Sequence, residues 1–392
     1  MTLSSSAAAA ARVGRLFRVV ALASIAVRLV RRRPRAAPLA AKLLAVPASP
    51  GQAGSASSHE PVSISVVIPA RDEAARIEAA ITPLVGAPGV IEIVVVDDES
   101  TDDTGSVAGA AGARVLRTSA RAGWAGKSAA LQQGIERSAG EWVVMLDADT
   151  RPDPRLPLAL VDRAAADGLD LTSGAGRVGA TSPATTAAHA ALLATLVARF
   201  GAPGGSAAAG RVLVSGQCLA VRRRAALDWG GFAPVADSTI EDVALARYLA
   251  ATGRSVAFLD ATGLLTVESY GSVRDTFVGW GRSLGLAGVD PARRRVVDVA
   301  TLFVLAPLAF GRLLVHRGDR VDALALGLRF GILVGAARAF ERRGAGYWLS
   351  PLLDPLAVGV LFVDLFRRRS TWRGRTVDRS WRPARTGARS AS

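Results

Sequence analysis

The chain has 392 residues, half of them hydrophobic and 21% charged, and it carries a formal net charge of +15. This apolar content excludes wholesale disorder, and at about 100–200 residues per domain the length allows one large or two modest domains. The single cysteine excludes an intrachain disulfide, and three scattered histidines argue against a histidine zinc site. The positive charge indicates an anionic partner, and the mean hydropathy of +0.29 favours a membrane.

The N-terminal region, residues 1–61, is expected to lie outside the folded domain that follows it. Val13–Val30 is mildly apolar, but arginines interrupt it, so it is too short and too charged for a span of about 20 apolar residues. An amphipathic surface helix and a weak signal anchor both fit this pattern. Residues 47–61 are rich in Pro, Gly and Ser, which predicts a flexible linker.

From Val62 onward, short apolar runs rich in β-branched residues alternate with segments of helical spacing. Strands are expected at residues 62–70, 90–98, 113–119 and 141–149, with helices at 72–85, 102–112 and 127–138 between them. Further elements are an apolar segment at Ala187–Phe200, strands at 214–221 and 255–261, and a helix at Ile240–Thr252. This alternation predicts an α/β fold with a mostly parallel sheet covered by helices.

Three apolar segments near spanning length follow the last predicted strand: Val296–Val315, Val321–Phe340 and Tyr347–Phe366. Each carries charged residues, and helices of a soluble domain are the alternative interpretation. Their clustering and their arginine-rich borders favour membrane helices. Positive-inside reasoning places residues 62–285 and the arginine-rich tail in the cytoplasm, which requires an even number of spans. We therefore expect Val321–Phe340 to lie in the membrane interface or to re-enter.

Two acidic clusters fall at the carboxyl ends of predicted strands, where ligands bind in parallel sheets. Asp97 and Asp98 end the strand at 90–98, and such a pair can accept hydrogen bonds from a uracil or a ribose. Asp147 and Asp149 end the strand at 141–149 and repel each other unless something binds them. Mg²⁺ or Mn²⁺ favours one or two carboxylates plus substrate phosphates, whereas a tight turn is the alternative.

Several motifs occur in a specific order: SVVIPARDE (65–73), VVVDDESTDDT (94–104), GWAGKSAALQQG (123–134), MLDADT (145–150), SGQCLAVRR (215–223), GGF (230–232) and STIEDVALARYL (238–249). Together they resemble the family 2 inverting glycosyltransferases with the GT-A fold. Within that family, the chain resembles the membrane-associated enzymes that glycosylate carotenoid or hopanoid-type lipids. The tail of those enzymes is similar to TWRGRTV (371–377).

On the donor side, the resemblance implies a nucleotide pocket lined by Pro69, Ala70 and Glu73. It implies that Asp97 and Asp98 hold the uracil and the ribose of a UDP-sugar. Lys127, one of only two lysines in the chain, would approach the nucleotide or its diphosphate as a point charge. Asp147 and Asp149 would position Mg²⁺ or Mn²⁺ on the diphosphate, with Asp147 also contacting the nucleotide.

On the acceptor side, the resemblance implies that Glu241 and Asp242 face the acceptor and that Asp242 is the general base. The alternative is that both acids only favour the first turn of a helix. Two departures from the family pattern stand out. Asp72 replaces the commoner Asn, and no full Gln-x-x-Arg-Trp motif accompanies Trp280, which argues for single-sugar transfer over processive synthesis.

The resulting expectation is a GT-A catalytic domain at 62–290, membrane helices at 291–366 and a basic tail at 367–392. The protein would lie at the cell membrane with its catalytic domain in the cytoplasm, and would use a lipid acceptor and no nucleic acid. A polar or polysaccharide acceptor and a non-catalytic membrane scaffold of the same fold are the alternatives. A sugar nucleotidyltransferase is disfavoured, because the first strand lacks a Gly-rich loop after it.

Overall fold

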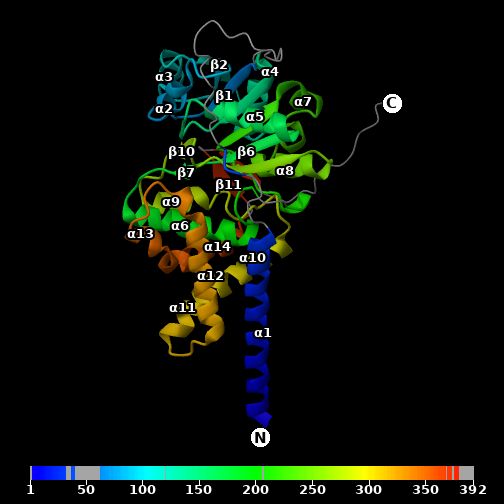
Figure 1. The fold of residues 1–392 in the computed structure, drawn as a ribbon. Coiled ribbons are helices and arrows are strands. Elements are labelled where there is room, and N and C mark those ends of the chain that lie inside the picture. The colour runs from blue at the N-terminus through cyan, green and yellow to red at the C-terminus, as the bar shows by residue number, and fades with distance from the viewer. Residues whose placement is uncertain are drawn as a thin grey trace, which may run out of the picture. The chain divides into compact units, whose positions relative to one another are not determined.

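The structure is a computed structural model, and it describes residues 2–31, 37–39, 62–119, 121–204, 207–367, 369–372 and 375–378. All of the predicted linker at 47–61 and most of the predicted tail at 367–392 lie outside the described residues. Internal contacts divide the chain into two compact units. Among the described residues, the sheet unit comprises those within 37–177 and 212–268, and the helical unit comprises those within 2–31, 178–211 and 269–378. Figure 1 shows their elements in chain order.

Among the described residues, seven strands of the sheet unit form one sheet with the order β3-β2-β1-β4-β8-β6-β9. They are β1 (Ile64–Ala70), β2 (Val90–Asp98), β3 (Arg114–Thr118), β4 (Trp142–Leu146), β6 (Leu171–Ala175), β8 (Cys218–Arg222) and β9 (Val256–Asp260). Strand β8 runs antiparallel to both of its neighbours, and the other pairs are parallel. The predicted α/β fold with a mostly parallel sheet is confirmed.

Helices flank this sheet and connect its strands. They are α2 (Ile77–Ile81), η1 (Thr82–Leu84), α3 (Thr104–Ala110), α4 (Gly126–Arg137), α5 (Leu156–Asp167), α7 (Arg223–Asp228), η3 (Ala233–Val235) and α8 (Glu241–Ala251). The short strands β5 (Thr150–Pro152) and β10 (Leu265–Val267) pair antiparallel, and β7 (Arg177–Val178) spans the unit boundary. The helix expected from Asp72 begins only at Ile77, because Asp72 has a left-handed φ of 52° that breaks helical geometry.

Helix α4 approaches β1 so closely that only a glycine fits at their contact. Gly134 in α4 is buried, and a Cβ atom added to it would lie 2.2 Å from Cγ1 of Val67 in β1. Gly109 in α3 differs, since it is exposed and an added Cβ would meet nothing nearer than Val115 at 3.9 Å. The distance between α4 and the sheet therefore depends on one missing methyl group.

We expect Gly134→Ala to lower the free energy of unfolding by about 1–3 kcal/mol, because the added methyl overpacks the contact with Val67. Gly109→Ala is the matched control, and it should be neutral or stabilise by up to about 1 kcal/mol, since alanine is the better helix former. Urea unfolding of both variants measures the difference. Equal midpoints for the two variants would contradict this packing.

The helical unit contains the remaining elements. They are α1 (Thr2–Arg31), α6 (Pro183–Phe200), η2 (Ala209–Arg211), α9 (Val273–Trp280), α10 (Ala292–Leu305), α11 (Pro307–Leu314), α12 (Arg320–Ala336), η4 (Ala337–Ala339), α13 (Ala345–Trp348), η5 (Ser350–Leu353) and α14 (Asp354–Asp364). Strands β11 (Arg369–Trp372) and β12 (Arg375–Asp378) form an antiparallel hairpin in the predicted tail. Helix α6 belongs to this unit, although it lies within the segment 62–290 expected to form the catalytic domain.

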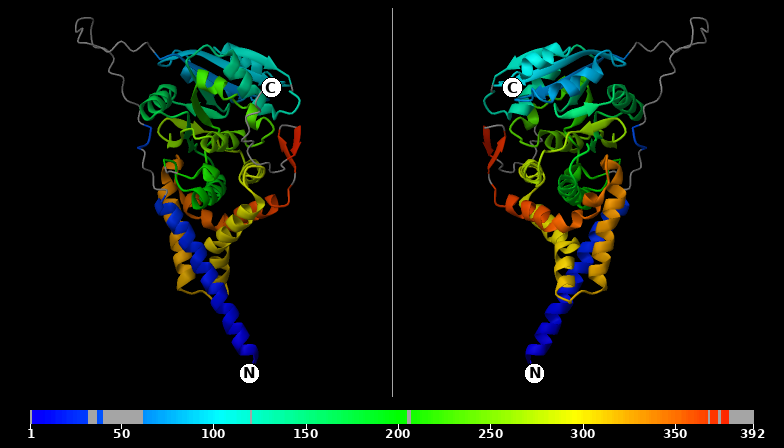
Figure 2. Two further views of the ribbon diagram at one scale, coloured as in Figure 1. Left: turned by 90° about the vertical axis from the view of Figure 1, so that its right-hand side faces the viewer. Right: turned by 90° about the vertical axis from the view of Figure 1, so that its left-hand side faces the viewer.

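Helix α1 is a packed part of the helical unit. Ala21, Leu22 and Ile25 are buried and share a hydrophobic cluster with residues of α6, α10, α12 and α14. Figure 2 shows α1, in blue, running alongside the yellow and orange helices, with its first half extending beyond them. The stretch at Val13–Val30 is therefore the C-terminal part of a 30-residue helix, which is longer than the apolar pattern indicates.

Only one of the three predicted C-terminal segments, within the described chain, forms a helix long and apolar enough to cross a membrane. It is Ala292–Leu314, 23 residues that include α10 and α11. Helix α12 has 17 residues, and the third segment is divided into α13, η5 and α14. Pro351 and Pro355 begin the last two of these, because proline lacks the N–H that would continue the preceding helix. One such helix is found where three near-spanning segments are expected, and the assignment of 291–366 to the membrane stays a prediction.

Most of the charges that interrupt these apolar segments are paired inside the helical unit. The pairs and their N–O distances are Arg18–Asp322 (2.6 Å), Arg211–Asp298 (3.1 Å), Arg295–Asp364 (2.8 Å), Arg312–Asp322 (2.9 Å) and Arg329–Asp354 (2.7 Å). A buried charge is costly unless a partner and hydrogen bonds compensate it. The pairs therefore explain how helices with such charges pack against one another.

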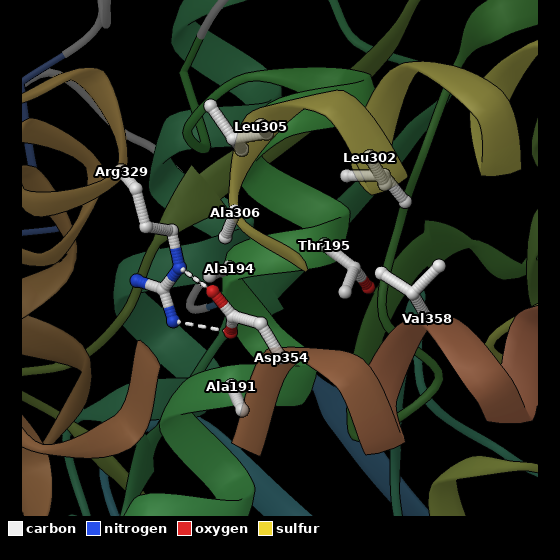
Figure 3. Close-up of a pocket in the computed structure, with 9 residues that line it drawn as sticks. All are labelled: Ala191, Ala194, Thr195, Leu302, Leu305, Ala306, Arg329, Asp354 and Val358. Atoms are coloured by element: carbon white, nitrogen blue, oxygen red, sulfur yellow. Dashed lines mark hydrogen bonds and ion pairs between the residues drawn. The ribbon is translucent and has the colours of Figure 1, made fainter. Parts of the chain in front are cut away.

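The most deeply buried of these pairs joins α12 to α14. Arg329, 1% exposed, donates from Nε and Nη2 to the two carboxylate oxygens of Asp354 at 2.7 and 2.8 Å. Figure 3 shows this fork beside a cavity of about 10 Å³, which Ala191, Thr195 and Leu305 also line. That volume is at the lower limit for one water molecule, so the helices are packed almost without space around the pair.

The outer surface of the helical unit is apolar. Among the described residues, every exposed large hydrophobic side chain except Val85 and Ile91 belongs to this unit. They are spread over α1, α10, α11, α12 and α14. Apolar surface on this scale is typical of a membrane or protein contact.

Candidate functional site

The carboxyl ends of β1, β2 and β4 meet at one edge of the sheet, because the three strands are parallel and adjacent. Ala70, the last residue of β1, pairs with Asp97, and Pro69 pairs with Val96. Asp147 and Asp149 follow the end of β4 directly. The fold therefore places Pro69, Ala70, Asp97 and Asp147 along one edge, as expected for a ligand site of this fold class.

The loops after β1 and β2 are tied together by side-chain hydrogen bonds. The carboxylate of Asp72 accepts bonds from the N–H and the hydroxyl of Thr101, at 2.7 and 3.1 Å. The bond from the Thr101 N–H is the main reason why the pKa of Asp72 is below its ordinary value. An Asn oxygen would accept the same bonds, so the departure from the family's Asn leaves this link intact.

Asp97 and Asp98 are both buried behind these loops. Oδ1 of Asp97 accepts a 3.0 Å bond from the Ser100 N–H. Arg71 donates to the backbone oxygen of Asp98 at 3.0 Å, and its guanidinium lies 3.8 Å from the Asp98 carboxylate. Arg71 holds a negative charge in place at the end of β2, a role that the sequence analysis missed although Arg71 stands inside the motif SVVIPARDE.

Lys127 lies between carboxylates from two other elements. Its Nζ, in the first turn of α4, is 2.7 Å from Asp147 Oδ1 after β4 and 3.1 Å from Glu241 Oε1 at the start of α8. Burial alone would lower the pKa of Lys127, but the charges of Asp147, Glu241 and Asp242 outweigh it and hold that pKa well above its ordinary value. Lys127 is therefore a permanent cation that joins β4 to α8.

Asp242 follows Glu241 in the first turn of α8. Its burial, and next the negative charge of Glu241, raise the pKa of Asp242 to about 7. Oδ1 of Asp242 accepts a 2.8 Å bond from the N–H of Val243. A carboxyl with this pKa exchanges its proton near neutral pH, which is the property that a general base needs.

Gly216 leaves the space in which this cluster sits. A Cβ atom added to Gly216 would lie 3.0 Å from Asp242 Oδ2 and 3.2 Å from Lys127 Nζ. The residue after Gly216 is Gln217, and its carbonyl oxygen accepts a 3.1 Å hydrogen bond from the N–H of Asp147. The motif SGQCLAVRR contains both residues, but nothing in its spacing identified Gly216 as a site position.

Asp149 is the second acid of the site whose pKa is raised, after Asp242. Burial first, and then the charges of Asp147 and Glu73, raise the pKa of Asp149 to about 7. Glu73 therefore lies within electrostatic reach of Asp149, which brings the end of β1 and the end of β4 to one place. The polar contacts thus form a group around the β1 and β2 loops and a group around Lys127, with Glu73 and Asp149 between them.

Asp147 and Asp149 fit a divalent cation by the chemistry of their donors. Their mutual repulsion is visible in the raised pKa of Asp149, and a hard cation would relieve it. Among the described residues, no group of three or more His, Cys, Asp or Glu side chains forms a protein-only metal site. Two carboxylates with further oxygens from a substrate are the arrangement that Mg²⁺ prefers.

Comparison with known families assigns the catalytic class. The family model for "Glycosyl transferase family 2" matches residues 65–228. A 4,4'-diaponeurosporenoate glycosyltransferase from Staphylococcus aureus is 34% identical over 89 residues, which cover 22% of this chain and 24% of that protein. The enzyme of that name from Staphylococcus haemolyticus is 34% identical over 90 residues. The chain thus spans about a quarter of the length of the curated relatives it matches.

Solved structures of glycosyltransferases are also similar. A mannosyltransferase from Pyrobaculum calidifontis, in complex with GDP-Man and Mn²⁺, is 17% identical with a TM-score of 0.47, covering 92% of this chain and 97% of its own. A glucosyl-3-phosphoglycerate synthase from Mycobacterium tuberculosis, with Mn²⁺ and UDP-glucose, is 29% identical with a TM-score of 0.31, covering 42% and 57%. The family match at residues 65–228 agrees with the predicted enzyme class, glycosyltransferase.

We expect Asp149→Asn to stabilise the metal-free protein above pH 7. Because the folded-state pKa of Asp149 is raised, its contribution to stability is complete below its unfolded pKa and is lost as the pH rises through about 7. The variant should therefore melt a few degrees above the wild type at pH 8 and at the same temperature near pH 4. Thermal unfolding in EDTA across this pH range measures the difference. A variant that is less stable than the wild type at pH 8 would refute the raised pKa.

Proposed function

We propose that this protein transfers one sugar from a UDP-sugar to a hydroxyl or carboxyl group of an isoprenoid lipid, with inversion at the anomeric carbon and with help from Mg²⁺ or Mn²⁺. The observation that carries the proposal is the convergence of Lys127, Asp147, Glu241 and Asp242 at the carboxyl edge of a family 2 glycosyltransferase domain. Fixed charges of both signs at this edge suit a reaction in which a diphosphate departs and a proton is removed.

The donor binds, in this proposal, along the ends of β1 and β2. Pro69, Ala70 and Glu73 line the nucleotide pocket, while Asp97 and Asp98 accept hydrogen bonds from the uracil and the ribose. The support is that both aspartates are buried at the strand ends and held by Ser100 and Arg71, so their oxygens are oriented before the donor arrives. Such preorganisation lowers the entropy cost of binding.

The diphosphate lies beside Lys127 and Asp147 in this proposal. Lys127 stays protonated because three carboxylates raise its pKa, so it presents a constant positive charge. Asp147 and Asp149 would hold a divalent cation, which would supply positive charge next to the departing nucleoside diphosphate. Asp149, whose pKa is raised to about 7, would have to be deprotonated to act as a ligand.

Asp242 accepts the proton of an acceptor hydroxyl as that oxygen attacks the anomeric carbon from the face opposite the diphosphate. Glu241 is held by Lys127 at 3.1 Å, so we assign it the role of raising the pKa of Asp242 and orienting α8. An acceptor carboxylate has already lost its proton. It follows that Asp242 is needed as a base for hydroxyl acceptors and much less for carboxylate acceptors.

The lipid acceptor and the membrane location rest on the helical unit. Its exposed apolar side chains and the 23-residue helix Ala292–Leu314 support contact with a bilayer. The partial relatives named 4,4'-diaponeurosporenoate glycosyltransferase support an isoprenoid acceptor. We propose that residues 62–290 form the catalytic domain on the cytoplasmic side, that 1–61 and 291–366 attach it to the membrane, and that 367–392 form a basic tail.

Purified protein in lipid vesicles should transfer radiolabel from a UDP-sugar, in the presence of Mg²⁺ or Mn²⁺, into the solvent-extractable lipid fraction. EDTA and Asp149→Ala should each abolish this transfer, because the diphosphate then lacks its counter-charge. Asp228→Asn, a change of an exposed acid in α7, is the matched control and should retain activity. Label that enters only a water-soluble product would show a polar acceptor, and no metal-dependent turnover of any nucleotide sugar would support a scaffold.

Asp242→Asn should reduce transfer to a hydroxyl acceptor by a factor of about 10² or more, in line with general-base contributions, while UDP-sugar binding stays unchanged. With a carboxylate acceptor the loss should be much smaller. The wild-type rate on the hydroxyl acceptor should rise with pH as Asp242 loses its proton near pH 7, and the variant should lack this rise. Initial rates with both acceptors at pH 5–9 measure these effects; a normal rate with the hydroxyl acceptor would place the base elsewhere.

A further inference from the structure

An apolar groove runs along the helical unit between α10–α11 and α14. It encloses about 510 Å³, within the range of about 300–1,000 Å³ that is usual for ligand sites. Val296, Val299, Phe303, Pro307, Gly359 and Phe362 are among its lining residues. All of the lining residues belong to the helical unit and none is charged or carries a polar side chain, so the groove suits a ligand without polar groups along its length.

The direction of the groove follows from an ion pair. Arg295, near the start of α10, lies 2.8 Å from Asp364 at the end of α14, so the start of α10 meets the end of α14. Helices α10 and α14 lie side by side in Figure 1. The groove therefore extends from Val296 and Leu365 at one end to Pro307 and Pro355 at the other.

The end of the groove near Val296 and Leu365 carries positive charge. Arg293 precedes Val296 by three residues and is exposed, and Arg367 follows Leu365 by two residues and is exposed. The opposite end is formed by two prolines, Pro307 and Pro355. An apolar channel with cations at one mouth complements an amphiphile that has a hydrocarbon chain and an anionic head.

The surroundings of the groove favour a lipid over a protein segment. Its first wall is the one described helix that is long and apolar enough to cross a membrane. The flanking side chains Val297, Leu314 and Val363 are exposed and apolar, outside the groove as well as inside it. Exposed apolar surface of this kind is typical of a membrane contact, where hydrocarbon chains cover it.

We propose that this groove binds the hydrocarbon chain of an anionic membrane lipid, with the head group at Arg293 and Arg367. The inference deepens the proposed function and rests on it in one respect, since it names this groove as the place where the chain of the acceptor lipid is held. Binding the chain in a protein groove keeps one lipid next to the enzyme, and the charged mouth selects lipids with an acidic head.

Gly359 offers a way to fill the groove without disturbing the helices. It lines the groove from α14, and an added Cβ atom would meet nothing within 4 Å. Gly335 in α12 is the matched control, because it is also helical, is exposed, has nothing within 4 Å of an added Cβ and does not line the groove. Gly359→Ala, Gly359→Leu and Gly335→Leu therefore form a series that differs in groove volume.

The probe is cis-parinaric acid, a fluorescent fatty acid with one carboxylate, added to the full-length protein in detergent micelles. We expect saturable binding to the wild type and to Gly335→Leu, an intermediate affinity for Gly359→Ala, and at least about tenfold weaker binding to Gly359→Leu. Arg293→Gln with Arg367→Gln should remove the preference for the acid over the corresponding alcohol. Circular dichroism melting verifies that each variant is folded, and Gly359→Ala retains the test if Gly359→Leu fails to fold.

Sugar transfer to lipid, measured on the same samples, separates the two proposals. Weaker probe binding by Gly359→Leu together with a raised KM for the lipid acceptor supports both. Weaker probe binding without any lipid glycosylation by the wild type supports the groove and overturns the proposed acceptor. Equal probe affinities for Gly359→Leu and Gly335→Leu overturn the groove proposal, as does a wild-type dimer that Gly359→Leu dissociates without any probe binding.

Discussion

The cost of burying charge shapes both units of this protein. A charge removed from water must be compensated by an opposite charge or by hydrogen bonds, or the group changes its protonation state. In the sheet unit this constraint produces the cluster around Lys127, where one cation serves Asp147 and Glu241. In the helical unit it produces a set of arginine–aspartate pairs that join helices distant in sequence.

The compensation in the sheet unit is incomplete, and it leaves two acids with raised pKa values. Burial, followed by the charges of neighbouring acids, raises the pKa values of Asp149 and Asp242 to about 7, and the single positive charge of Lys127 does not offset these effects. Both acids are strained in the electrostatic sense, since each would be more stable as a neutral side chain. Sites of this kind are typical of function, because a protein optimised for stability alone would replace them.

In the helical unit, arginine–aspartate pairs compensate the buried charges, and these pairs join helices to one another. Arg329 donates two hydrogen bonds to the carboxylate of Asp354, and there is almost no space around this pair. At the other end of α14, Arg295 pairs with Asp364. With its charges paired inside, the unit can present apolar side chains outside. Breaking such a pair would leave one buried charge without compensation, so the pairs also determine which helices lie next to one another.

The sequence by itself determined the elements of the sheet and the order of the site motifs. Strand β2 has the predicted bounds, and β1, β3, β4 and β9 lie within the predicted runs, because buried parallel strands have an apolar pattern that is local in the chain. The family motifs located Lys127, Asp147 and Glu241, whose proximity the fold then produced; the roles given to them remain proposals. The helical elements were predicted less well, since the charges in α12 and α14 made the apolar pattern irregular.

Tertiary structure decided the partner of each charge, the space left by Gly216 and the place of α1 and α6. Arg18 and Asp322 are 304 residues apart, so no local pattern relates them. Gly216 acquires its meaning only when Lys127 and Asp242 are brought next to it from α4 and α8. Hydrophobic periodicity shows which side of a helix or strand is buried, but not which element covers that side. The pairing of charges depends on which element covers it.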